Sequence, residues 1–250
     1  MTDSTTIIIW ISITFIAAGL VKGVLGMGLP TVAMGVLSLV MAPATAAAML
    51  VVPSLVTNVW QLLAGPAFGA LLRRLATMML AVFAGTILSI GVLTGQSASL
   101  AGAALGAILA LYGALGLAAP HFTVSAKVEH WLSPLIGLVT GLITGATGIF
   151  VIPAVPYLNS LGLAKENLIQ ALGLSFTVST IALACGLSLS DQFRLEAAST
   201  SLLAVVPALV GMFLGQRVRG KLQPEAFRRW FFIGLVVLGA YMIARVFGTK

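Results

Sequence analysis

Charged residues are scarce in this sequence. Only 8% of its 250 residues are Asp, Glu, Lys or Arg, whereas 60% are hydrophobic. A soluble domain carries about 25% charged residues, so this chain lacks the side chains that would cover a water-exposed surface. The composition excludes a soluble globular protein and predicts an all-α integral membrane protein.

Side chains for catalysis and metal binding are equally scarce. The one cysteine, Cys185, lies in an apolar run, which excludes an internal disulfide and a cysteine metal cage. The sequence has no Ser-His-Asp set, no His-x-x-x-His pair and no phosphate-binding loop. No Asp or Glu lies in the core of an expected membrane span, which argues against a carboxylate proton relay or sodium site. We therefore expect no enzyme activity, no cofactor and no metal site.

The net charge of +7 comes from basic residues that cluster between apolar runs. Arg73 and Arg74 form one cluster, and five basic residues between positions 217 and 229 form the other. Clusters of this kind mark cytoplasmic connections in membrane proteins. The charge therefore indicates orientation in a lipid bilayer, and it does not indicate a nucleic-acid partner.

Six apolar runs have the length of an ordinary membrane span, which is about 20 residues. They cover residues 44–64, 75–93, 99–118, 167–187, 198–216 and 227–247. Two further runs, 6–41 and 131–160, are too long, because as single helices they would measure ~54 Å and ~45 Å at ~1.5 Å per residue. A hydrocarbon core is only ~30 Å thick, so we expect each long run to be a broken or re-entrant helix hairpin.

Loop charge predicts how the units are oriented. Counting from the basic clusters places the connections at 121–130 and at Lys165-Glu166 inside, so the 131–160 unit starts and ends on one side. The same count places both chain termini outside, although Arg245 and Lys250 lie near the C-terminus. Each half then holds one hairpin unit and three spans. The sequence thus predicts an inverted-topology repeat with halves 1–120 and 121–250, and its first apolar run has no features of a signal peptide.

The two long runs share a glycine-rich signature. Residues 19–30 read GLVKGVLGMGLP and residues 137–148 read GLVTGLITGATG. Matched helix breaks in corresponding halves point to the substrate site of a transporter. Gly-x-x-x-Gly pairs also serve close helix packing in membranes, which is the reading we keep for Gly102 and Gly106.

A helix that restarts inside a membrane presents free N–H groups and the positive end of its dipole, which would attract an anion. Pro30 suits the first turn of such a restart, and Thr147 with Gly148 is expected at the corresponding restart in the second half. We expect substrate contacts from both breaks. The residues are Gly26, Met27, Gly28, Pro30, Thr31, Thr144, Gly145, Ala146, Thr147 and Gly148.

A polar stripe follows each break and should face the protein interior or a wet cavity. For the side-chain amides of Asn58 and Gln61, substrate contact and helix–helix hydrogen bonding are equally well supported. The stripes are Ser54, Asn58 and Gln61 in the first half, and Ser175 and Ser179, with Thr177 and Thr180 nearby, in the second.

Lys22 is the one charged residue well inside an expected span, about one turn before the first break. An intramembrane lysine is a functional candidate, here as an anion partner or a charge on the access path. The alternatives are that it reaches the cytoplasmic interface or lies against the negative end of its half-helix. Its counterpart in the second half is Thr140, so the charge breaks the repeat.

The signatures at 19–30 and 137–153, with the segment ALGLSF at 171–176, resemble the sulfite exporter TauE/SafE family, also called the 4-toluene sulfonate uptake permease family. The likeness covers essentially the whole chain. Where the family usually has consecutive glycines, this chain has Gly-Met-Gly-Leu-Pro from residue 26 and Gly-Ala-Thr-Gly from residue 145. The resemblance implies a multi-pass bacterial inner-membrane carrier for small sulfur-containing organic anions such as sulfonates, sulfinates or sulfite. In such a membrane, the termini that the loop charges place outside are periplasmic.

The leading hypothesis is a secondary transporter that works by alternating access around the two breaks. Its partners would be a small anionic, organosulfur substrate, the lipid bilayer and, as a coupling ion, H+ or Na+. A passive anion channel of the same architecture and a membrane scaffold or sensor subunit are the alternatives.

Overall fold

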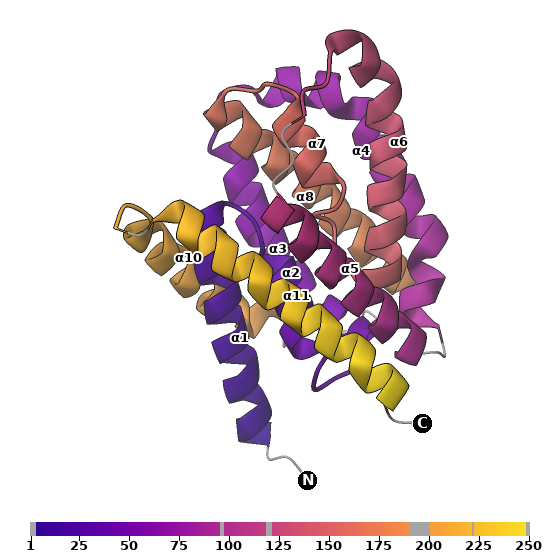
Figure 1. Cartoon of the computed structure of the whole chain (residues 1–250), viewed down its shortest axis with the longest axis vertical. Coiled ribbons are helices and arrows are strands. Elements are labelled where there is room, and N and C mark those ends of the chain that lie inside the picture. Colours follow the sequence, from indigo (N-terminus) through magenta and orange to yellow (C-terminus); the bar gives the residue numbers. More distant parts are fainter. Residues whose placement is uncertain (1–3, 96–97, 119–121, 191–200, 222, 249–250) are drawn as a thin grey trace.

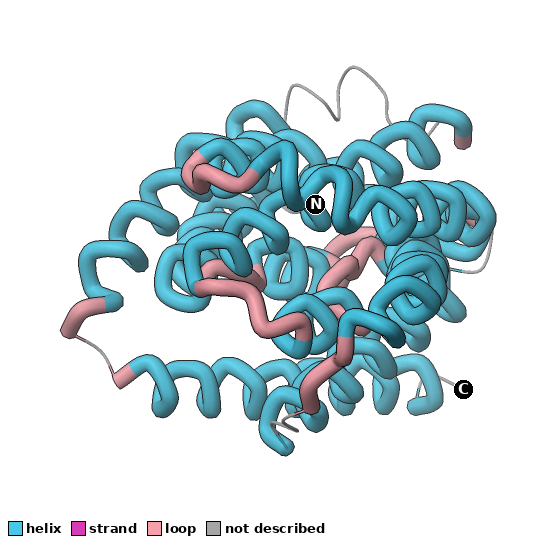
Figure 2. The backbone as a smooth tube through the Cα atoms, turned by 90° about the horizontal axis from the view of Figure 1, so that it is seen from above, coloured by secondary structure: helices cyan, strands magenta, loops and turns pink. Residues whose placement is uncertain are grey.

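The computed structural model describes residues 4–95, 98–118, 122–190, 201–221 and 223–248. All regular structure in these ranges is helical (Figures 1 and 2). The helices are α1 (Ser4–Leu25), α2 (Leu29–Leu37), α3 (Pro43–Leu63), α4 (Phe68–Thr94), α5 (Ala98–Ala118), α6 (Ala126–Thr147), α7 (Ala154–Ser160), α8 (Lys165–Leu189), α10 (Val205–Arg219) and α11 (Pro224–Gly248).

Within the described residues, seven helical segments are long and apolar enough to cross a membrane, which confirms the predicted membrane class. Each of the six expected ordinary spans overlaps one of them, although the start of 198–216 falls outside the described residues. Figure 1 shows the start of α1 and the end of α11 toward the lower end of the view and the start of α6 at the upper end.

The two long runs each contain two helices. In the first, α1 ends at Leu25 and α2 begins at Leu29, with Pro30 in the first turn as expected. In the second, the expected restart at Thr147 and Gly148 is wrong: Thr147 is the last residue of α6, and α7 begins at Ala154 after a longer link. The reason is local, because Gly148 adopts a left-handed φ of 73° that ends α6, and α7 begins only after its N-cap residue Pro153.

The signature glycines of the first half serve close helix packing. A Cβ atom on Gly19 would lie 2.1 Å from the carbonyl oxygen of Ala208, and one on Gly23 would lie 2.2 Å from that of Met212. Real Cβ atoms do not approach carbonyl oxygens so closely, so only glycine lets the backbones of α1 and α10 meet.

The second half repeats this arrangement with α6 and α4. A Cβ atom on Gly137 would lie 2.3 Å from the carbonyl oxygen of Met78, and one on Gly141 would lie 2.2 Å from that of Val82. The glycines at the first and fifth positions of each signature thus serve helix packing, and the substrate hypothesis falls on the residues after them. Of the pair kept for packing, Gly106 contacts the backbone of α11 at Gly239, whereas Gly102 has open space around it.

A proline inside α3 is matched by a serine of a later segment. Pro53 lacks the N–H that would bind the carbonyl of Met49 one turn earlier. The hydroxyl of Ser201, which is fully buried, donates to this Met49 oxygen at 2.7 Å. Ser201 therefore satisfies an acceptor that Pro53 leaves without its helical partner, and it fixes the middle of α3.

Candidate functional site

The amine of Lys22 lies in the protein interior and contacts α3. Its side chain is only 4% exposed, and Nζ donates to Thr57 Oγ1 at 3.1 Å and to Asn58 Oδ1. Thr57 and Asn58 are fully buried. The amine of Lys22 is therefore enclosed by protein and shielded from solvent.

Asn58 extends the contact to α8. Its Nδ2 donates to Thr180 Oγ1 at 3.2 Å, and this hydroxyl in turn donates to the carbonyl of Phe176 at 2.7 Å. A continuous row of hydrogen bonds thus runs from Lys22 on α1 through Asn58 on α3 to Thr180 on α8. We call Lys22, Thr57, Asn58 and Thr180 the lysine cluster.

Two members of the lysine cluster were outside the predicted site set. Thr57 precedes Asn58 directly, and Thr180 lies one residue after Ser179, so both are one position off the predicted stripes. The hydroxyl of Thr57 also donates to the carbonyl of Pro53 at 2.8 Å. A sequence signal for them exists, because Asn58 is the only asparagine of the two stripes. Expecting Lys22 to bond Asn58 would have pointed to the neighbouring hydroxyls.

The lysine cluster contains no acidic residue. Among the buried side chains that the structure describes, Lys22 alone carries a formal charge. A buried charge is costly unless it is paired with an opposite charge. Two protein oxygens accept hydrogen bonds from this amine, whereas an ammonium group has three N–H donors. The arrangement is therefore suited to an anion as the third acceptor and the counter-charge.

Four predicted substrate contacts are fully buried hydroxyls without a hydrogen-bond partner among the described residues. They are Thr31 on α2, Ser54 on α3, and Ser175 and Ser179 on α8. A buried hydroxyl without a partner costs free energy of about 1–3 kcal/mol. Hydroxyls on α2, α3 and α8 are thus available to a ligand with several oxygen atoms.

The first break requires glycine at two positions. Gly26 and Gly28 have φ angles of 76° and 105°, in the left-handed region that other residues avoid. The N–H of Gly26 donates to the carbonyl of Lys22 at 2.7 Å, and Gly28 packs against Val21, so the start of α2 lies beside the turn that carries Lys22. Met27 is half-buried, and its sulfur accepts a hydrogen bond from Tyr112 at 3.3 Å.

The predicted contacts in the second break are already engaged within the protein. The hydroxyls of Thr144 and Thr147 donate to carbonyls of their own helix, at 2.7 Å each. Gly145 packs against the backbone of α4, where a Cβ would lie 2.2 Å from the carbonyl oxygen of Thr86, and Ala146 is half-buried. None of these contacts brings the four residues to the lysine cluster.

The two breaks nevertheless approach each other through α2. Gly148 lies against the side chain of Met34, one turn after Thr31. The segment 149–152 that follows is buried, and the ring of Phe150 lies 5.5 Å from that of Phe176 on α8. The second break therefore forms part of the wall around α2 and α8.

Two glutamines connect α3 with α8. Gln61 donates to the carbonyl of Ile169 at 3.0 Å, which is a helix–helix hydrogen bond. The sequence analysis missed Gln170, which is fully buried, donates to the carbonyls of Leu62 and Gly65 at 2.7 Å each, and accepts from the N–H of Ala67 at 2.8 Å. These bonds satisfy the backbone at the end of α3 and hold that end of α3 against α8.

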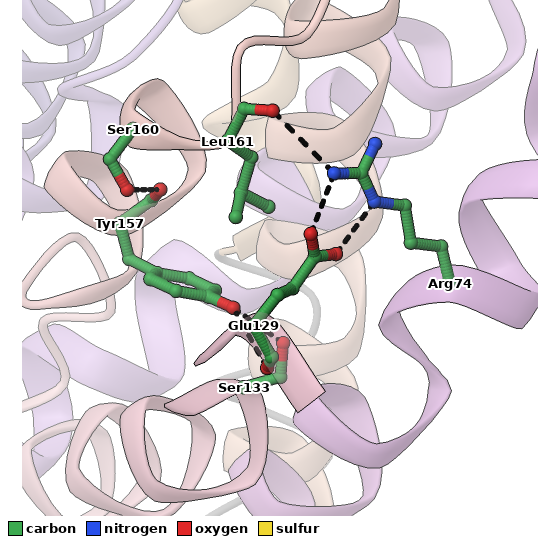
Figure 3. Close-up of polar contacts among 6 residues, drawn as sticks. All are labelled: Arg74, Glu129, Ser133, Tyr157, Ser160 and Leu161. Carbon is green, nitrogen blue, oxygen red and sulfur yellow. Dashed lines mark hydrogen bonds and ion pairs between the residues drawn. The ribbon is translucent and has the colours of Figure 1, made fainter. Parts of the chain in front are cut away.

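A second polar cluster ties α4, α6 and α7 at the end of the helices that carries Arg73 and Arg74 (Figure 3). Arg74 forms a bidentate ion pair with Glu129 at 2.6 and 2.7 Å and reaches the carbonyl of Leu161 at 3.5 Å. Tyr157 on α7 lies 2.5 Å from Ser133 on α6, through their hydroxyl oxygens. The side chain of Arg74 is 40% exposed, so the ion pair belongs to the surface and not to the buried site.

Residues 11–242 match the family described as Sulfite exporter TauE/SafE. No curated protein and no solved structure matches the chain. The matched range includes both breaks, the lysine cluster and the second polar cluster.

Proposed function

The chain belongs to the sulfite exporter TauE/SafE family, and from this premise we propose that it is a secondary transporter for a small sulfur-containing organic anion. Family membership and the seven apolar helices make it a multi-pass membrane transporter. The finer proposal is that a sulfonate, sulfinate or sulfite-type anion binds between α1, α2, α3 and α8 of a bacterial inner-membrane protein.

The observation that carries the proposal is the buried amine of Lys22, which hydrogen-bonds two neutral oxygens and has no buried carboxylate among the described residues. An anionic head group would supply the missing counter-charge. Hydrogen bonds from an ammonium group to an anionic oxygen are about twice as strong as neutral ones. A sulfonate has three oxygens, which could accept from Lys22 and from hydroxyls such as those of Ser54 and Ser175 at the same time.

The N-terminus of α2 supports the same position. It starts after Gly28, has Pro30 in its first turn and is nine residues long. Its free N–H groups and dipole favour an anion, and the fully buried hydroxyl of Thr31 in this turn has no partner among the described residues. We assign the anion to the N-terminus of α2 and not to that of α7, because α7 has only seven residues. The second break, from Thr144 to Gly148, enters the proposal as the opposite wall.

Alternating access is supported by the matching contacts that equivalent helices of the two halves make with each other. The first helix of each half packs on a late helix of the other: α1 on α10 and α6 on α4. The corresponding helices α3 and α8 meet each other, and so do α5 and α11. Such reciprocal contacts are what a two-fold inverted repeat produces, with 1–120 and 121–250 as its halves. We propose that Arg73 and Arg74 face the cytoplasm and that both termini are periplasmic.

Equilibrium binding to purified protein in detergent tests the proposal. We expect saturable binding of methanesulfonate, methanesulfinate or sulfite, weaker binding of acetate, and loss of affinity in Asn58→Ala. Folded, monodisperse protein that binds none of these anions would contradict the proposal. The passive-channel alternative predicts flux that does not saturate and no counterflow of labelled anion.

A further inference from the structure

The hydrogen bonds of Lys22 fit the neutral amine as well as the ammonium group. A neutral amine has two N–H donors, and the amine has two acceptors, Thr57 Oγ1 and Asn58 Oδ1. Protonation of the nitrogen lone pair adds a third N–H and a positive charge, and both then require a further partner. A bound anion provides an acceptor and a negative charge together.

No other ionisable group in the described residues offers this partner. The helices α2 and α3 contain no ionisable side chain, and α1 contains only Lys22. The ionisable groups on the other neighbouring helices form no hydrogen bond with Lys22. They are Tyr112 on α5, which bonds Met27; Lys165, Glu166 and Cys185 on α8; Arg217 and Arg219 in the last turn of α10; and Glu225, Arg228, Arg229, Tyr241 and Arg245 on α11.

We propose that Lys22 binds a proton together with a singly charged anion, so that the transported unit is one monoanion and one proton and carries no net charge. This inference rests on the proposed function of the same site. The amine nitrogen takes up the proton when the anion arrives, forming an N–H bond, and returns it when the anion leaves. Binding of each partner raises the affinity for the other, because linkage between two ligands is reciprocal.

The same balance of charge predicts which anions are accepted. One ammonium neutralises one negative charge, whereas a dianion would leave an uncompensated charge in a buried site. We therefore expect monoanions such as methanesulfonate and hydrogen sulfite to be substrates. Sulfate, which is a dianion at neutral pH, should be excluded.

Proteoliposomes with the full chain test the inference. An inward proton gradient should drive accumulation of labelled methanesulfonate, with one proton entering per anion. A membrane potential imposed with potassium and valinomycin should leave the rate unchanged. Counterflow of methanesulfonate without any pH gradient tests the proposed function separately. Wild-type protein that shows counterflow but no proton uptake, or that moves net charge, would overturn the inference and leave the proposed function intact.

Variants of Lys22 sharpen this test. Lys22→Arg keeps a charge that does not deprotonate. It should keep counterflow while losing accumulation driven by a proton gradient, and retained accumulation would overturn the inference. Lys22→Gln should lower methanesulfonate affinity on the order of 1,000-fold, because the ammonium charge that attracts the anion is lost together with its hydrogen bond. Lys165→Gln removes an exposed lysine at the start of α8 and serves as the matched control. If the Lys22 variants do not fold, the number of protons that enter per methanesulfonate in the wild-type protein decides whether the inference holds.

Discussion

Replacing Asn58 by aspartate gives the sharpest test of the lysine cluster. Asn58→Asp keeps the shape of the side chain and the oxygen that accepts from Lys22 Nζ. It also places a carboxylate beside the one formally charged side chain among the buried, described residues. The variant should therefore fold, with its own carboxylate supplying the counter-charge that a bound anion brings to the wild-type site.

The expected loss of affinity follows from Coulomb's law. Two unit charges about 4 Å apart interact with about 4 kcal/mol at an effective dielectric constant of about 20. The new carboxylate lies within hydrogen-bond reach of Lys22 and cancels most of this attraction for the substrate. Since each 1.4 kcal/mol or so is a factor of ten, methanesulfonate affinity should fall on the order of 1,000-fold.

The assay is equilibrium binding of labelled methanesulfonate, together with the melting temperature in detergent. We expect Asn58→Asp to melt at or above the wild-type temperature while binding is lost. Asn159→Asp adds the same charge at an exposed position of α7 and should leave affinity within about twofold. A well-folded Asn58→Asp protein with wild-type affinity would refute the reasoning that Lys22 attracts the anion.

Three further predictions concern the frame around the site. Gly141→Ala should lower the free energy of unfolding by about 1–3 kcal/mol, because a Cβ there would lie 2.2 Å from a carbonyl oxygen of α4. Gly102→Ala, whose Cβ would lie in open space, should not lower it, and melting temperatures in detergent compare the two variants. Ser201→Ala should cost about 1–2 kcal/mol, since it removes the donor to the carbonyl opposite the proline of α3, and a loss below about 0.3 kcal/mol would contradict this role. A double-mutant cycle of Arg74→Gln and Glu129→Gln should give a coupling of only about 0.2–1 kcal/mol, because this ion pair is partly exposed; a value above about 2 kcal/mol would show that it acts as a buried pair.

Much of the fold could be predicted because membrane insertion constrains length and composition so strongly. Six apolar runs of about 20 residues each overlap a helix, and both overlong runs contain two helices. The end of α6 was harder to place. Thr147 and Gly148 were expected at the start of a new helix because Gly148 matches Pro30 in the signature, but the left-handed Gly148 ends α6 there, and α7 begins only after Pro153. Local backbone conformation decided the boundary, and periodicity carries no information on it.

The candidate site was predictable in part. The stripe of Ser54, Asn58 and Gln61 could be read from helical spacing, as could the intramembrane position of Lys22. That Lys22 bonds Asn58 depends on how the side chain of Lys22 reaches α3 from α1 in the folded protein, which a single sequence does not specify. The glycine signatures were also ambiguous from sequence, because packing and substrate binding both require close backbone approach, and only the carbonyl oxygens of α4 and α10 identify packing.

Counterflow of labelled methanesulfonate in proteoliposomes is the most direct test of the central claim. With equal pH on both sides, unlabelled methanesulfonate inside the vesicles should accelerate and transiently concentrate the labelled anion, with a rate that saturates. Asn58→Asp should abolish this exchange, and Asn159→Asp should not. Flux that rises linearly with concentration and shows no counterflow, or saturable counterflow that Asn58→Asp leaves unchanged, would contradict a transporter that binds its anion at Lys22.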